Sequence, residues 1–272
     1  MKLKPVIFTD LDGTLLDLET YTCEKALSSI EDLRKRGIPV VFCSAKTRAE
    51  QEIYRRQLKI PDPFIVENGG AIFIPEDYFP FDFDYQKVQD GYRVIVLGIS
   101  YLEVRRILER ICRDNRVKIT GFGDLSAEEV SALTGLDVPA SHRAKAREYE
   151  ETINLEGGSG ERDRILKLVR EAGLNYAAGA RFYGIMGPND KGKAARILMG
   201  LFRRKLGDIL TIGLGDSPND IPMLSEVNIP ILVQKPGGAW EDVSLPNLRK
   251  VKGIGPVGWA AAIGEVFRDC IF

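Results

Sequence analysis

The 272-residue sequence predicts an α/β fold, in which a doubly wound, Rossmann-like core of parallel strands carries an inserted α+β cap domain. Three observations predict this architecture. Short apolar runs alternate with helical patterns near both ends of the chain, as in a parallel sheet covered by helices. The middle of the chain has a different pattern, in which this alternation is lost. Acidic residues directly follow buried runs, at the sheet edge where such folds bind ligands.

The N-terminal part alternates between strand and helix patterns. Residues 5–9 form a short apolar run that predicts a buried strand. Apolar side chains recur at helical spacing over residues 23–36, and Gly37 follows, where glycine commonly ends a helix. The elements expected next are a strand at 38–45, a helix at 47–58, and strands at 63–69 and 70–75.

The middle and the C-terminal part complete the prediction. In the middle we expect strands at 92–98, 116–122 and 151–157, helices at 100–114, 126–135 and 161–173, and two strands within 175–187. The tail is expected to hold helices at 191–206, 218–227 and 258–269 and strands at 209–215 and 229–234. The sequence therefore predicts a catalytic core of residues 1–82 and 187–272, interrupted by a substrate-selecting cap of residues 83–186.

The composition excludes several classes of protein. The 38 basic and 39 acidic residues balance to a net charge of −1, so nothing indicates a nucleic-acid partner. No apolar run approaches membrane-spanning length. The four cysteines lack CxxC spacing, which is typical of reduced thiols and of a cytoplasmic protein. His142 is the only histidine, which makes zinc enzymes and serine–histidine triads poor explanations.

Carboxylates follow two of the predicted strands. Asp10 and Asp12 come directly after the first strand, two positions apart, so they can approach one point from the same face. Taken alone, this pattern fits an acidic turn equally well. Asp216, Asn219 and Asp220 follow the strand at 209–215. A second acidic cluster at the same sheet edge favours a hard cation such as Mg²⁺.

Other polar residues are expected at this edge. Ser44 ends the second strand and could also cap the following helix. Asn68 ends the third strand, where an ordinary turn is the alternative. Lys191 begins a helix, and a cation there opposes the helix dipole, which favours a role in neutralising an anionic ligand. The alternative is a plain surface lysine, with Lys193 as a competitor.

Taken together, "DLDGT", Ser44, Lys191 and "GDSPND" resemble the four motifs of the haloacid dehalogenase superfamily of phosphohydrolases. The insertion between the second and third motifs resembles the C2-type cap of the Cof-like branch, which includes many sugar phosphatases. The resemblance implies a Mg²⁺-dependent phosphatase whose partner is a small phosphorylated sugar or glycerate. It says nothing about the oligomeric state.

The resemblance also implies roles for the acidic residues. Asp10 would be the nucleophile that forms an aspartyl-phosphate, and Asp12 would be the general acid and base. Two close carboxylates raise the proton affinity of one of them, which suits this division. Mg²⁺ would be held by Asp10, the backbone carbonyl of Asp12, and Asp216.

The remaining implied roles concern phosphate and substrate. Ser44 and Lys191, with help from Asn219, would hold the phosphoryl oxygens. Asp220 would orient either Lys191 or a metal-bound water, and Asn68 would support the site. The cap candidates for substrate contact are Arg147, Glu148 and Arg181, with a solvated surface charge as the alternative for each.

Three other functions stay open at this point. They are a phosphatase for another sugar phosphate, a phosphosugar mutase, and a catalytically silent sugar-phosphate binding protein. The intact nucleophile, acid, lysine and metal aspartates argue against the last of these. Asp17, the third acid near the first strand, is expected to be a solvated residue or a charge at the start of the following helix.

Overall fold

The computed structural model describes residues 3–155, 158–179 and 181–269. At its centre is a five-stranded parallel sheet in the order β13-β12-β11-β1-β2. Its strands are β1 (Lys4–Thr9), β2 (Val40–Phe42), β11 (Ile209–Gly215), β12 (Ile229–Gln234) and β13 (Arg249–Ile254). This sheet confirms the predicted α/β class, and it joins the two ends of the sequence, since β1 lies between β2 and β11.

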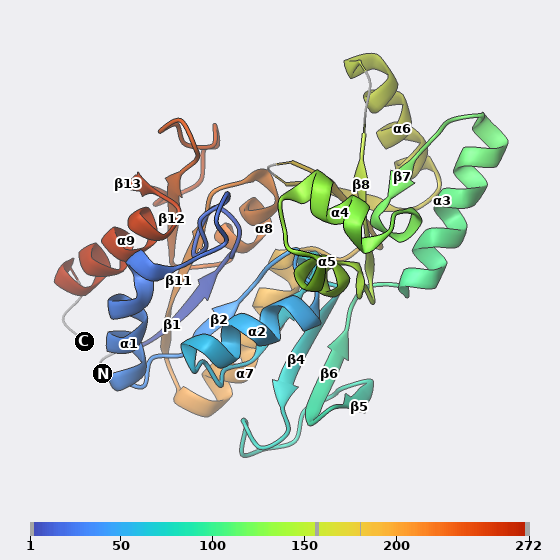
Figure 1. Ribbon diagram of the computed structural model, residues 1–272. Coiled ribbons are helices and arrows are strands. Elements are labelled where there is room, and N and C mark those ends of the chain that lie inside the picture. Colours follow the sequence, from blue (N-terminus) through green and yellow to red (C-terminus); the bar gives the residue numbers. More distant parts are fainter. Residues whose placement is uncertain (1–2, 156–157, 180, 270–272) are drawn as a thin grey trace.

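Helices cover both faces of the central sheet, because successive side chains of each strand point to opposite sides. Ile7 packs on one face with α1 and α9, whereas Val6 and Phe8 pack on the other with α7 and α8. Figure 1 shows α1 and α9 on the side of the sheet away from α7. The covering helices are α1 (Leu27–Lys35), α7 (Lys191–Leu206), α8 (Ile221–Leu224) and α9 (Pro256–Asp269).

The third predicted strand does not continue the parallel sheet. It forms β3 (Phe64–Val66), which pairs antiparallel with β4 (Ala71–Pro75) in a second sheet of order β3-β4-β6-β5. Only a single bridge between Cys43 and Ile65 links it to the end of β2. The chain reverses through a tight turn at Asn68, whose φ of 52° lies in the left-handed region, and this turn favours pairing with the next strand.

A third sheet, of order β7-β8-β10-β9, forms the centre of the inserted region. Its apolar side, including Ile153 and Ile185, packs with Val104 of α3 and Val169 of α6. In Figure 1 this region lies above the end of the core sheet, with α4 and α5 nearest the core. Its elements are α3 (Tyr101–Asn115), β7 (Thr120–Gly121), α4 (Ala127–Thr134), α5 (Val138–Lys145), β8 (Glu150–Asn154), α6 (Ser159–Glu171), β9 (Asn175–Ala178) and β10 (Tyr183–Met186).

One α-helix and two strands were not predicted, and several predicted elements, β2, β3, β7 and α8 among them, are shorter than expected. Helix α5 begins at a capping residue, Asp137, whose carboxylate accepts a hydrogen bond from the backbone N–H of Ala140 at 2.6 Å. This capping signal could have been found in the sequence. Strands β5 (Lys87–Gln89) and β13 were also not expected. The strand expected at 116–122 contains only the two residues of β7.

The division into core and cap remains a proposal. Strand β6 (Tyr92–Val96) pairs with β4, and β5 pairs with β6, although both lie beyond the boundary expected at residue 82. We therefore propose that the inserted domain begins after β6 and not at residue 83. In the part of the chain that the structure describes, no helix has the length and apolar character needed to cross a membrane.

Candidate active site

The carboxyl ends of three neighbouring core strands deliver the predicted site residues to one edge. Asp10 follows β1, Ser44 lies just beyond β2, and Asp216 follows β11. Lys191 is the first residue of α7 and points to the same place. A cavity at this edge is lined by Asp10 and Ser44 from the core and by side chains of the inserted region.

Lys191 lies buried between two carboxylates. Its Nζ is 2.5 Å from Asp10 Oδ1 and 2.7 Å from Asp220 Oδ1, and its side chain is fully shielded from solvent. Burial raises the pKa of Asp10 well above its usual range, and Asp220 raises it further, whereas Lys191 lowers it. Burial alone would lower the pKa of Lys191, but the two carboxylates outweigh it and raise that pKa. Lys191 is therefore a fixed buried cation and not a surface lysine.

The turn after β11 explains why Asp220 faces the lysine. The other carboxylate oxygen of Asp220, Oδ2, accepts hydrogen bonds from the backbone N–H groups of Asp216 and Ser217, both at 3.0 Å. A Cβ at Gly215 would lie 2.5 Å from the Cβ of Asp220, so only glycine fits there. The sequence "GDSPND" thus closes a tight turn that uses both oxygens of Asp220.

Asp216, at the end of β11, is held in place by two hydroxyl groups. Its carboxylate oxygens accept hydrogen bonds from the hydroxyls of Thr14, at 3.0 Å, and Ser217, at 2.8 Å. Gly13 has a φ of 79°, and a Cβ there would lie 2.9 Å from Asp216 Oδ2. Burial and the neighbouring Asp220 raise the pKa of Asp216 to about 7.

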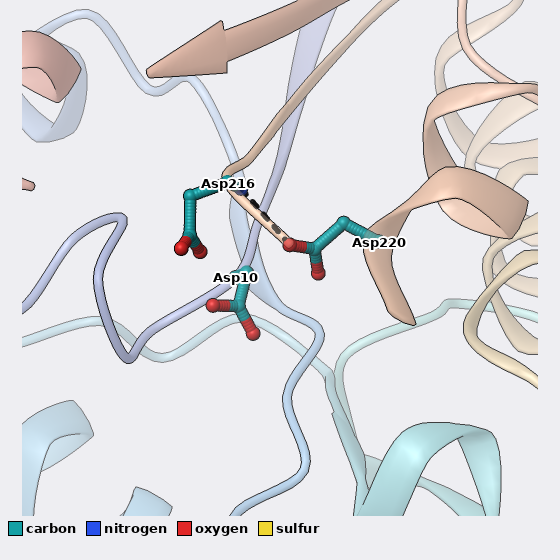
Figure 2. Close-up of side chains that lie close together, drawn as sticks. All are labelled: Asp10, Asp216 and Asp220. Carbon is teal, nitrogen blue, oxygen red and sulfur yellow. Dashed lines mark hydrogen bonds between the residues drawn. The ribbon is translucent and has the colours of Figure 1, made fainter. Parts of the chain in front are cut away.

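Figure 2 shows the carboxyl groups of Asp10, Asp216 and Asp220 close together, Asp10 from the end of β1 and the other two from the turn after β11. One oxygen from each lies within 4.8 Å of the others. The donors are carboxylate oxygens, which suit a hard divalent cation. The acidic cluster can therefore hold a metal ion.

Asp12 is separated from this cluster. Its Oδ1 lies 3.0 Å from Lys46 Nζ, and Lys46 also contacts Glu50 at 3.2 Å. Each of the two adjacent acids thus has a lysine of its own, Lys191 for Asp10 and Lys46 for Asp12. This pairing shows how the chain accommodates two neighbouring carboxylates, and the sequence analysis had assigned Asp12 no partner.

Ser44 is buried, and it does not cap the following helix. Helix α2 (Arg48–Leu58) is capped by Thr47, whose hydroxyl accepts a hydrogen bond from the backbone N–H of Glu50 at 3.2 Å. The Ser44 hydroxyl accepts the backbone N–H of Lys46 at 3.2 Å and lines the cavity. Its hydrogen is therefore available to an anion bound there.

A chain of hydrogen bonds connects the core to the inserted region along the cavity wall. Asn219 donates to Asn68 Oδ1 at 3.1 Å, and Asn68 donates to Glu150 Oε2 at 2.7 Å. Glu150 Oε1 accepts from Arg147 at 2.9 Å, and Arg147 also donates to the carbonyl of Ala45 at 3.1 Å. Asn68, Asn219 and Arg147 are thus parts of one network.

Of the three cap candidates, two line the cavity and one does not. Arg147 and Arg181 line the cavity, and Arg181 donates to the backbone carbonyls of Thr134 and Leu133. Glu148 does not line it: its carboxylate contacts Arg48 at 3.3 Å and Lys87 at 3.4 Å.

Several residues that line the cavity were not expected from the sequence, among them Glu150, Thr152 and Tyr21. Glu150 lies on β8, and strand alternation places Thr152 on the same face, so this periodicity could have indicated both. Tyr21 of the segment between β1 and α1 also lines the cavity, and no pattern around it predicts this.

Comparison with known proteins places this geometry in a family. The model of the haloacid dehalogenase-like hydrolases matches residues 7–90. A glucosyl-3-phosphoglycerate/mannosyl-3-phosphoglycerate phosphatase of Methanococcoides burtonii is 48% identical over 265 residues, which cover 97% of each chain. A mannosyl-3-phosphoglycerate phosphatase of Pyrococcus furiosus is 42% identical, over 84% of this chain and 90% of that protein.

Solved structures share the fold over nearly the whole chain. A protein of Thermoplasma acidophilum superposes with a TM-score of 0.68 at 18% identity, covering 98% of both chains. A phosphatase of the haloalkanoate enzyme superfamily from Bacteroides thetaiotaomicron superposes with a TM-score of 0.66 at 17% identity, covering 98% of this chain and 95% of the other. The complete architecture, insertion included, thus recurs in these proteins.

Proposed function

Since the chain belongs to the haloacid dehalogenase-like hydrolases and is a phosphoric monoester hydrolase, we propose that it converts mannosyl-3-phosphoglycerate to mannosylglycerate and phosphate. The geometry that carries the chemistry is the buried Lys191 between Asp10 and Asp220, beside Asp216. The names of the relatives support the substrate. Glucosyl-3-phosphoglycerate is a second candidate, because the Methanococcoides burtonii relative is named for both.

Asp10 is the proposed nucleophile. One of its carboxylate oxygens forms a bond to phosphorus as the bond from phosphorus to the glycerate oxygen breaks, which leaves an aspartyl-phosphate. Asp12, in the same cavity, gives a proton to the departing oxygen. Asp12 then takes a proton from the water that attacks the aspartyl-phosphate, so phosphate is released and Asp10 is restored.

Negative charge on the phosphoryl oxygens is balanced by groups already in place. Lys191 contacts Asp10 directly and can hold a phosphoryl oxygen without reorganisation, because Asp220 fixes its ammonium group. The Ser44 hydroxyl and the Asn219 amide line the same cavity and would donate hydrogen bonds to the remaining oxygens. Asn68 keeps Asn219 in place.

The proposed metal is Mg²⁺, held by Asp10, Asp216 and the backbone carbonyl of Asp12. The oxygen-only donor set around Asp216 fits it, as does the close approach that Gly13 permits. When bound, Mg²⁺ would reduce the repulsion between the carboxylate nucleophile and the anionic phosphate. Asp220 is the third member of the acidic cluster, but its Oδ1 is paired with Lys191 and its Oδ2 accepts two backbone N–H groups, whereas each oxygen of Asp216 accepts only one hydroxyl; we therefore assign Asp220 to Lys191.

The surroundings of the site fit a small anionic substrate in the cytoplasm. Lys46, Arg147 and Arg181 line the cavity and can balance the glycerate carboxylate. In the part of the chain that the structure describes, Cys23, Cys43 and Cys112 are free thiols, which suits a reducing compartment.

A phosphate-release screen tests the proposal. The purified protein is incubated with Mg²⁺ and each of mannosyl-3-phosphoglycerate, glucosyl-3-phosphoglycerate, 3-phosphoglycerate and common hexose phosphates. The highest kcat/KM is expected for a glycosyl-3-phosphoglycerate. A higher value for a hexose phosphate would overturn the assigned substrate, and an isomeric phosphosugar without free phosphate would indicate a mutase.

A further inference from the structure

The segment between β1 and α1 is organised by Asp17. One carboxylate oxygen of Asp17, Oδ1, accepts hydrogen bonds from the backbone N–H of Glu19 at 3.0 Å and from the backbone N–H and hydroxyl of Thr20 at 2.8 and 3.0 Å. The backbone N–H of Asp17 donates to the carbonyl of Thr22, and the carbonyl of Asp17 accepts a hydrogen bond from the backbone N–H of Tyr21. Asp17 is thus partly solvated, as one of the two expectations had it, but it does not begin the following helix, and its carboxylate organises the turn.

Tyr21 has an unusual backbone conformation at the end of this turn. Its φ is 55°, in the left-handed region that bulky side chains rarely adopt. Such strain persists only where the surrounding structure enforces it, and it is concentrated at functional sites. The bonds made by Asp17 enforce it here, and the Tyr21 side chain consequently lines the catalytic cavity together with Leu18.

The contacts of Tyr21 place it between the catalytic edge and the inserted region. Its hydroxyl donates to the backbone carbonyl of Thr134, the last residue of α4, at 3.3 Å. Lys46 Nζ, which holds Asp12, lies 5.0 Å from the centre of the Tyr21 ring. The ring therefore stands next to the ion pair of Lys46 and Asp12, at the cavity wall that meets the inserted region.

The cavity has a mixed lining. Besides Asp10, Ser44, Asn219 and several charged side chains, it includes the apolar side chains of Leu18, Phe122, Leu136 and Phe182. A sugar ring has faces of C–H groups and a rim of hydroxyls. An aromatic ring with a polar tip, such as that of Tyr21, matches both features.

We propose that Tyr21, held in place by the Asp17 turn, packs against the glycosyl group of the substrate and determines specificity for it. The inference rests on the proposed function in one respect, namely that the substrate carries a sugar on the far side of the phosphate. It adds a core residue to a specificity site that the sequence analysis had sought only in the cap.

The test compares two tyrosines on either side of Lys46. Tyr54 lies 6.0 Å from Lys46 Nζ, measured to its ring centre, but lines only the adjoining cavity and not the catalytic one. For wild type, Tyr21→Ala and Tyr54→Ala, kcat/KM is measured with mannosyl-3-phosphoglycerate and with p-nitrophenyl phosphate, which has no sugar. The ratio of the two values isolates recognition of the glycosyl group.

Tyr21→Ala is expected to lower this ratio about tenfold to hundredfold, chiefly through the KM for the glycosyl substrate. Tyr54→Ala should leave the ratio at the wild-type value. Tyr21→Phe keeps the ring, so its ratio should stay closer to wild type than that of Tyr21→Ala. An unchanged ratio in Tyr21→Ala, or an equal fall in Tyr54→Ala, would overturn the proposal.

Asp17→Ala provides a second, independent variant, because it removes the turn but leaves the ring. Its ratio should fall in the same direction as that of Tyr21→Ala, and a wild-type ratio would contradict the role given to the turn. Failure of the proposed function is visible separately, in the wild-type protein. If wild type prefers another phosphorylated sugar, the same ratios are measured with that sugar phosphate.

Discussion

The catalytic edge of the core and the cap wall of the same cavity are built in different ways. At the edge, Asp10, Ser44 and Asp216 occupy the ends of three adjacent strands, and the parallel sheet alone brings them together. In the inserted region, Arg147 joins a polar network, whereas Glu148 turns away to Arg48 and Lys87. A regular sheet therefore fixes where side chains meet, whereas the orientation of a charged side chain on an irregular segment depends on contacts with distant parts of the chain.

The largest expected effect lies at the catalytic edge. Asp10→Asn removes the nucleophile and is expected to lower kcat by about 10⁴-fold or more, because the proposed mechanism has no other group that can attack phosphorus in its place. Steady-state phosphate release measures this loss, and circular dichroism checks the fold. Asp32→Asn, an exposed residue of α1, is the matched control and should have wild-type activity. Metal-dependent turnover in Asp10→Asn near the wild-type rate would break the assignment of this edge.

Lys191→Met tests whether the buried cation is essential at the same edge. We expect kcat to fall about 10²- to 10³-fold, because the phosphoryl charge loses its preorganised partner. The variant should also lose roughly 3–5 kcal/mol of stability, since Asp10 and Asp220 become buried carboxylates without a cation. Urea unfolding measures the second effect. Lys193→Met, on the exposed side of α7, should change neither quantity.

The requirement for Mg²⁺ should depend on pH. EDTA is expected to abolish activity and Mg²⁺ to restore it. Burial and Asp220 raise the pKa of Asp216 to about 7, and a metal binds only the deprotonated carboxylate. Protons therefore compete below pH 7, and the half-saturating Mg²⁺ concentration should rise about tenfold for each unit that the pH falls. The same half-saturating concentration at pH 6 and pH 8 would contradict the metal site.

The smallest effects are expected in the inserted region, where the adjacent residues Arg147 and Glu148 should respond differently to substitution. Arg147→Met should raise KM about tenfold, because a cavity-lining cation and its hydrogen bonds are lost. Glu148→Gln should change KM less than about twofold, since its partly exposed ion pairs lie outside the cavity. Equal changes of KM in the two variants would contradict the assignment of Arg147, but not Glu148, to the lining of the substrate cavity.

The meeting of Asp10, Ser44 and Asp216 at one edge of the sheet could be predicted from the sequence, for a physical reason. Apolar runs mark parallel strands, and the carboxyl ends of parallel strands meet at one edge, so Asp10, Ser44 and Asp216 were expected to lie together. The doubly wound core was confirmed on the same grounds. The pairing of Lys191 with Asp220 was expected only from the family resemblance, because no sequence pattern shows that Lys191 is buried.

The rest depended on long-range contacts that no local pattern encodes. The pairing of Asp12 with Lys46, and of Glu148 with Arg48, joins segments that come together only in the fold. Tyr21 lines the cavity because its backbone is forced into a rare conformation, which no propensity would predict. The third strand left the parallel sheet because the turn at Asn68 returned the chain antiparallel.

Trapping of the phosphorylated intermediate would decide whether Asp10 carries the phosphoryl group. Asp12→Asn is mixed with p-nitrophenyl phosphate, whose leaving group needs no proton, so that the first step proceeds and the hydrolysis of the intermediate is slowed. Acid quenching, borohydride reduction and peptide mass spectrometry then locate the aspartyl-phosphate as homoserine. We expect homoserine at position 10. Homoserine at another aspartate, or none at position 10 while nitrophenol is released in a burst, would contradict it.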